Sequence, residues 1–95
     1  MKLVSISPSP NPKKKYVAIF RLDNGRTKTI HFGAKGYSDF ISSKSETKKA
    51  SYLARHSVNE DFDNPTTAGA LSRWILWNKT TLSASISDFK SRFNL

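Results

Sequence analysis

The sequence contains no cysteine, and this absence excludes a disulfide framework, a thiolate metal site and a cysteine nucleophile. Acidic residues are scarce, because seven Asp and Glu face sixteen Lys and Arg, for a formal net charge of +9. No apolar run is long enough to span a membrane. The first residues lack the apolar centre of a signal peptide, so we expect a protein that is not secreted. A chain of 95 residues has room for one domain.

The positive charge is concentrated in the first part of the chain. Residues 1–56 contain twelve basic and three acidic side chains, whereas residues 57–95 contain four of each. This asymmetry predicts a cationic half that meets an anionic partner and a neutral half that packs. The alternative is that the excess lysine only maintains solubility.

The N-terminal residues 1–14 are predicted to be a flexible Ser/Pro/Lys arm. Residues 5–12 (SISPSPNP) favour neither a helix nor a central strand, because proline lacks the backbone donor. They lead into Lys13, Lys14 and Lys15, which suit contact with a phosphate backbone, although the arm could equally be a disordered leader. Residues 15–95 are then the single folded domain.

Residues 16–22 (YVAIFRL) and 26–32 (RTKTIHF) are predicted to form an antiparallel hairpin. The Asn-Gly pair at 24–25 is typical of a two-residue type I′ turn. This turn would place Arg21 opposite Lys28, and like charges in that arrangement destabilise a strand pair. The same register pairs Ile19 with Ile30 and Val17 with Phe32.

The hairpin carries a third cation, Arg26, at its tip, so we interpret it as a ribbon that contacts an anionic partner. A two-stranded ribbon fits the major groove of DNA. The alternative is that the long cationic side chains only cover apolar surface of the ribbon.

Gly33-Ala34-Lys35-Gly36 admits two interpretations. The glycines allow a concave nest of backbone N–H groups that binds an anion beside Lys35. They also suit the end of a strand that needs positive φ. Residues 37–41 (YSDFI) are a candidate third strand.

The next segment is predicted to be a helix that presents a basic face. Ser43 and Glu46 have the spacing of a capping box, which starts the helix near Lys44 and lets it run to about His56. The spacing puts Lys44, Lys48, Tyr52 and Arg55 on one face.

The second half of the chain supplies the packing helices. Asn64 and Pro65 suit the start of a helix that is apolar on nearly all sides and extends to Trp77. Thr81 is expected to cap a last helix with one apolar stripe. A helix-turn-helix arrangement is disfavoured, because residues 81–85 bring no cation to a DNA groove.

No motif in the sequence indicates an enzymatic activity. His31 and His56 are the only acid–base candidates near neutral pH, and neither lies in a familiar catalytic motif. We therefore predict no catalytic residue, no metal and no cofactor.

Three blocks of the sequence resemble those of a family of small basic proteins. They are HFGAKGYSDF (31–40), YLARH (52–56) and NPTTAGALSRWILWNK (64–79), and the resemblance extends over residues 27–93. The family is encoded by giant nucleocytoplasmic large DNA viruses, most of all those of marseillevirus type. The resemblance implies a DNA-handling protein of the virion or of the host cytoplasm or nucleus, and it implies no catalytic residue.

Together these observations predict an α+β fold, in which a basic hairpin, with or without a third strand, packs against two or three helices. We expect it to bind double-stranded DNA through phosphates, without strong sequence preference. The expected contacts are Lys13, Lys14, Lys15, Arg21, Arg26, Lys28, Lys35, Lys44, Lys48 and Arg55. The alternatives are RNA binding and a protein adaptor that docks an acidic host or capsid partner. Apolar patches on both faces of the hairpin also raise the hypothesis of a homodimer.

Overall fold

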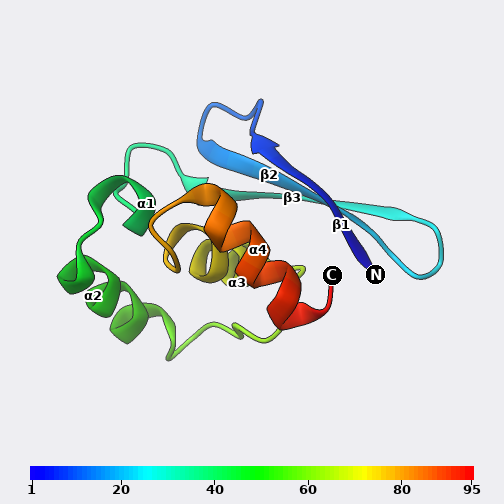
Figure 1. Cartoon of the computed structure of the whole chain (residues 1–95). Helices are drawn as coiled ribbons and strands as arrows, with labels where there is room; N and C mark the ends of the chain where they lie inside the picture. Colours follow the sequence, from blue (N-terminus) through cyan, green and yellow to red (C-terminus); the bar gives the residue numbers. More distant parts are fainter.

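The computed structural model describes all 95 residues and has an antiparallel sheet with a layer of helices on one side of it (Figure 1). The predicted α+β class is confirmed. The strands, in the order β1-β2-β3, are β1 (Lys2–Pro8), β2 (Lys14–Arg21) and β3 (Thr27–Ala34). The helical elements are α1 (Phe40–Ser43), α2 (Glu46–His56), α3 (Ala68–Leu71), the π-helical turn η1 (Ser72–Leu76) and α4 (Leu82–Phe93).

The prediction that residues 1–14 form a flexible arm is wrong for most of that segment. Strand β1 pairs antiparallel with β2, so the third strand precedes the hairpin and does not follow it. Proline is tolerated here because β1 is an edge strand and Pro8 ends it. Leu3 and Ile6 pack against the core from this strand, on either side of a register shift.

The predicted hairpin register is wrong by one residue. Only Gly25 has a positive φ (+83°) in the turn; its N–H donates to the Leu22 carbonyl, and the Leu22 N–H donates to the Arg26 carbonyl. This is a three-residue loop, a turn followed by a left-handed glycine, and not a type I′ turn. The observed partners are Arg21 with Thr27, Phe20 with Lys28, Ile19 with Thr29, Ala18 with Ile30, Val17 with His31 and Tyr16 with Phe32.

The corrected register explains the core, because a slip of one residue exchanges the two faces of a strand. Phe20 and Phe32 now share the face that meets the helices, and both are fully buried. They pack with Leu71, Ile75 and Phe89 from the helical layer. All five side chains have no exposed surface, so the helical layer seals this face of the sheet from solvent at these positions.

The helices begin at different caps from those predicted. Asp39 caps α1, so residues 37–41 are not a strand. Lys44 takes a left-handed conformation (φ +52°) that ends α1, and Ser45 then caps α2. Helix α2 ends at His56 as predicted.

The C-terminal helices also differ at one boundary. Thr67, not Asn64, caps α3, which continues into η1. The predicted cap at Thr81 is confirmed for α4. None of the helices combines the length and the apolar character needed to cross a membrane.

Candidate nucleic-acid face and ligand groove

No helix covers the open face of the sheet, which carries Arg21, and the Lys2–Arg21 end of this face is basic. Lys2 on β1 pairs with Arg21 on β2, and Thr27 on β3 completes this row. All three residues are exposed. Because no helix covers them (Figure 1), their charges and hydroxyl are available to a partner.

The β2–β3 turn extends this basic face. Arg26 is exposed at the tip, and its backbone N–H is fixed by the Asn24 side chain at 3.0 Å. The one acid of the turn, Asp23, pairs with the terminal amine of Met1, which lowers the pKa of that carboxyl. Asp23 is therefore engaged by a cation other than the arginines.

Two more predicted contacts mark the opposite end of the sheet. Lys13 and Lys35 are exposed, and the Lys35 N–H donates to the Lys13 carbonyl at 3.0 Å. The Tyr37 N–H closes a turn on the Ala34 carbonyl. The Lys35 amide is therefore used within the protein and does not contribute to an anion nest, and the strand-end interpretation is supported because Gly33 has φ +79° within β3.

Three of the predicted cations form hydrogen bonds within the protein, and of these only Lys15 is neutralised by a carboxylate. Lys15 Nζ is 2.6 Å from Asp39 Oδ2 and also donates to the Tyr37 carbonyl at 2.5 Å. Lys28 does not face Arg21, and it donates to the Thr66 hydroxyl at 3.3 Å. Lys44 precedes α2, so it does not share the face of Lys48, and its ammonium donates to the Ile41 carbonyl at 2.9 Å.

The Lys15–Asp39 pair is the most buried ion pair of the protein. Its side chains are 17% and 9% exposed. Burial alone would raise the pKa of Asp39, but the Lys15 ammonium and Ser42 outweigh that effect and lower it below its ordinary value. Lys15 is therefore a structural residue that joins β2 to α1.

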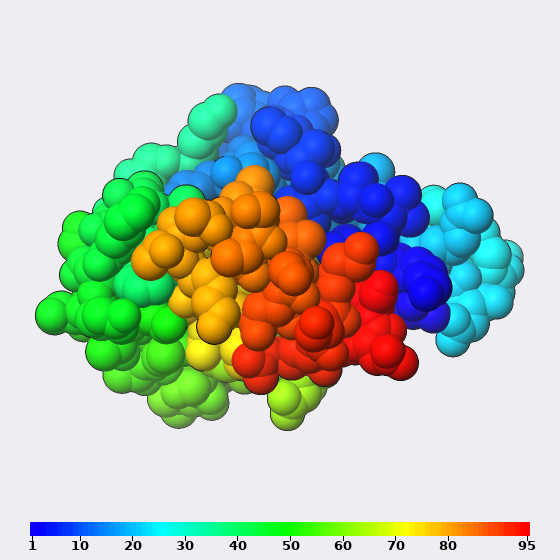
Figure 2. All heavy atoms as spheres, in the orientation of Figure 1, coloured from blue at the N-terminus to red at the C-terminus, as the bar shows by residue number.

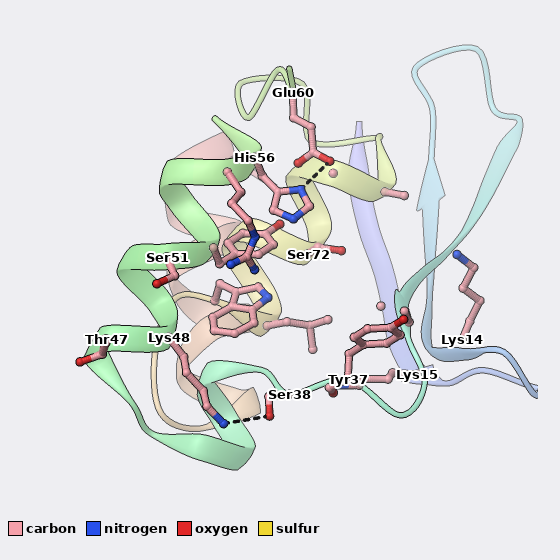
Figure 3. A pocket seen from close by; sticks show the side chains of 18 residues that line it. Lys14, Lys15, Tyr37, Ser38, Thr47, Lys48, Ser51, His56, Glu60 and Ser72 are labelled. Carbon is pink, nitrogen blue, oxygen red and sulfur yellow. Dashed lines mark hydrogen bonds and ion pairs between the residues drawn. The ribbon is translucent and has the colours of Figure 1, made fainter. Parts of the chain in front are cut away.

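A groove of about 800 Å³ lies between α2 and the adjoining ends of β2 and β3 (Figure 3). Its floor is an aromatic stack. The Trp77 and Tyr52 rings are 4.7 Å apart and nearly parallel at 10°, and the His56 ring follows at 4.3 Å from Tyr52. Burial, together with the nearby Glu60 carboxylate, raises the pKa of Tyr52, so its hydroxyl remains protonated at neutral pH.

The last three predicted cations line this groove. Lys48 and Arg55 extend from α2, seven residues apart and so on one helix face with Tyr52. Lys14, on β2, also lines the groove, and its side chain extends along the outer edge of the sheet, away from Lys48 (Figure 3). Lys48 reaches the Ser38 hydroxyl at 3.3 Å, and none of the three forms an ion pair with a carboxylate.

One acid, Glu60, enters the groove. Its Oε1 is 3.2 Å from His56 Nδ1, while its Oε2 is buried without a hydrogen-bond partner. The carboxylate lies against Gly69, where an added Cβ would come within 3.2 Å of Oε2. Three unpaired cations against one carboxylate leave the groove positive.

The ten predicted contacts therefore do not gather at one place. Figure 2 shows the β2–β3 turn projecting at one end of the molecule and α2 at the other, along a longest dimension of 40 Å. Four of the residues (Lys13, Arg21, Arg26 and Lys35) flank the sheet, and three (Lys14, Lys48 and Arg55) line the groove. Of the other three, Lys15 is neutralised by Asp39, whereas Lys28 and Lys44 are exposed and donate to neutral oxygens.

Comparison with known proteins adds a family. Residues 4–56, more than half of the chain, match a family described as a family of unknown function (DUF5754). The chain belongs to this family. The match covers β2, β3, α1, α2 and most of β1, and therefore the open sheet face and the α2 wall of the groove. No curated protein and no solved structure matches the chain significantly.

Sequence reasoning missed three residues of these surfaces. Lys2 lies in the segment predicted to be an arm, so the sequence does not indicate its place beside Arg21. Glu60 stands four residues after His56, and that spacing was the available signal for their contact. Tyr37 is 74% exposed at the rim of the groove, whereas the sequence makes it the first residue of the candidate strand 37–41.

Proposed function

We propose that the protein binds double-stranded DNA, largely independently of base sequence, through phosphate contacts of the open sheet face. The pairing of Lys2 with Arg21 on adjacent strands carries the proposal. Like charges in such a pair destabilise a sheet, and a bound polyanion removes that penalty. No carboxylate stands on the strands of this face, so the protein does not neutralise the pair itself.

The arrangement of the other polar residues supports the same partner. Arg26 continues the positive charge at one end of the sheet, and Lys13 and Lys35 provide it at the other. Eight residues of β2 separate the two ends, which corresponds to about 26 Å of strand. Exposed hydroxyls between them, such as that of Thr29, suit hydrogen bonds to phosphate oxygens.

The salt dependence of binding tests this proposal. If the five cations Lys2, Lys13, Arg21, Arg26 and Lys35 each neutralise one phosphate, log K falls against log salt with a slope of about −4.5. A mobility-shift titration with random duplex, single-stranded DNA and RNA competitors, repeated at increasing salt, measures the slope and the preference. A slope near zero excludes the electrostatic mechanism, and stronger competition by RNA assigns the face to RNA.

A matched pair of variants locates the contact. Arg21→Gln/Arg26→Gln should make the slope less steep by about 1.8 and should weaken binding to duplexes of unrelated sequence equally. Lys79→Gln/Lys90→Gln removes the same charge from exposed positions outside the sheet and should leave binding close to wild type. Arg73 and Arg92 are unsuitable controls, because both stack on Trp74. Equal losses in the two variants would show that only net charge matters.

A further inference from the structure

We propose that the groove between α2 and the sheet is a separate binding site for a nucleotide. The groove recognises three parts of this ligand: the phosphate, the heterocycle and an amino group on the heterocycle. The volume of about 800 Å³ is within the range of small-molecule sites. This site does not depend on the DNA-binding proposal, because the groove and the basic sheet face share no cation.

The phosphate is assigned by the cations of the two walls. Lys48 and Arg55 on α2 and Lys14 on β2 have no carboxylate partner, while the neighbouring Lys15 is already neutralised by Asp39. The Lys48 ammonium, at the Ser38 end of the groove, is the donor for the phosphate, while Arg55 along α2 and Lys14 on β2 add positive charge to the groove (Figure 3). The Ser38 hydroxyl, 3.3 Å from Lys48 Nζ, adds a neutral donor at the same end.

The heterocycle is assigned by aromatic residues at the floor and the rim. Trp77, Tyr52 and His56 form a continuous stack along the floor, with ring centroids 4.7 and 4.3 Å apart. Tyr37 stands at the rim with 74% of its surface exposed, which is unusual for a large aromatic side chain (Figure 3). Because Tyr52 and Trp77 are buried and stacked on each other, a flat base of any identity packs on the ring surfaces that remain exposed, those of His56 and Tyr37.

The amino group is assigned by Glu60. Its Oε2 is buried against Gly69, away from any ligand. Its Oε1 is held by His56 Nδ1 at 3.2 Å, and 32% of the Glu60 side chain remains exposed at the groove. An exocyclic amine of adenine or cytosine can donate to this exposed part of the carboxylate, whereas a purely anionic ligand cannot.

Binding of nucleoside monophosphates to the full chain tests the site. Adenosine 5′-monophosphate and cytidine 5′-monophosphate are titrated by calorimetry, with adenosine and inorganic phosphate as fragments. We expect both nucleotides to bind, and each fragment to bind at least about tenfold more weakly, because each makes only part of the contacts. Failure of both nucleotides to bind at millimolar concentration overturns the proposal.

Variants then assign each part of the ligand. Lys48→Gln/Arg55→Gln should weaken adenosine 5′-monophosphate about tenfold and leave adenosine unchanged. Glu60→Ala should abolish the preference for this nucleotide over purine riboside 5′-monophosphate, which lacks the amino group. Lys79→Gln/Lys90→Gln is the charge-matched control, and thermal melts check that every variant folds. Nucleotide binding that is the same in all three variants overturns the assignment of the groove.

The same chemistry occurs in a free nucleotide and at the 5′ end of a DNA strand. A 5′-phosphorylated tetranucleotide and its unphosphorylated form distinguish the two sources. Both are titrated into Arg21→Gln/Arg26→Gln, in which the sheet face is weakened and the groove is intact. Tighter binding of the phosphorylated strand than of the mononucleotide assigns a strand end, and the reverse assigns a free nucleotide. If no nucleotide binds to the groove, duplex binding by the sheet face is unaffected. The nucleotide site and the DNA-binding face are therefore tested independently.

Discussion

Asp39→Asn should destabilise the protein by about 2–3 kcal/mol at pH 7, because it leaves the half-buried Lys15 ammonium without its counter-charge. The substitution keeps the shape of the side chain and one oxygen. That oxygen can still accept the hydrogen bond from the Ser42 N–H, whose nitrogen lies 2.8 Å from Asp39 Oδ1 in the wild type. Asp39→Ala removes that N-cap as well and should cost about 1 kcal/mol more. The pair joins β2 to α1, so the loss falls on the link between the sheet and the helical layer.

The pH dependence separates the charge from the shape. The pKa of Asp39 is lowered in the folded protein, so its contribution is complete above the ordinary pKa of about 3.9 and is lost as the pH falls through the folded value. The difference between wild type and Asp39→Asn should therefore be constant from pH 7 to 5 and shrink below pH 4. Denaturant unfolding at pH 7, 5 and 3 measures this difference.

Two controls accompany this measurement. Asp63→Asn removes an exposed acid that has no ion pair and should change stability by less than about 0.5 kcal/mol. A double-mutant cycle with Lys15→Met gives the coupling of the two side chains. A coupling near zero, or a pH profile that Asp39→Asn does not alter, would contradict a stabilising pair.

The fold class followed from patterns that depend on neighbouring residues alone. The Asn-Gly pair located the turn, and Thr81 located the start of α4. The register did not follow, because two-residue and three-residue loops both accept Asn-Gly, and burial of Phe20 with Phe32 decides between them. Likewise β1 is stabilised by pairing with β2, which its Ser/Pro composition does not reveal.

The candidate sites were only partly foreseeable for the same reason. A basic character was evident from the charge distribution, but which cations remain unpaired depends on long-range contacts. Lys15 meets Asp39 across 24 residues, and Lys28 meets Thr66 across 38. The aromatic floor joins Tyr52 to Trp77, which belong to different elements. Sequence spacing could place Lys48 and Arg55 on one helix face, but it could not show that this face lines a groove.

Gly33→Ala should destabilise the protein by about 3 kcal/mol or prevent folding, because two separate effects add. The φ of +79° is strained for any residue with a side chain. The added Cβ would also lie 2.7 Å from Leu76 Cδ1 and 3.2 Å from Lys15 Cβ. Leu76 is buried under the sheet, so it has little room to move.

Gly36→Ala separates the two effects, because Gly36 has a similar φ of +94° and open space where its Cβ would stand. It should cost only the backbone strain, about 1–2 kcal/mol. Combining Gly33→Ala with Leu76→Ala should recover part of the loss, since the smaller side chain removes the contact although it leaves a cavity of its own. Denaturant unfolding of Gly33→Ala, Gly36→Ala, Leu76→Ala and the double variant measures both terms. Equal losses for Gly33→Ala and Gly36→Ala would mean that β3 shifts to avoid Leu76, and the wall of the groove would then be less rigid than its packing indicates.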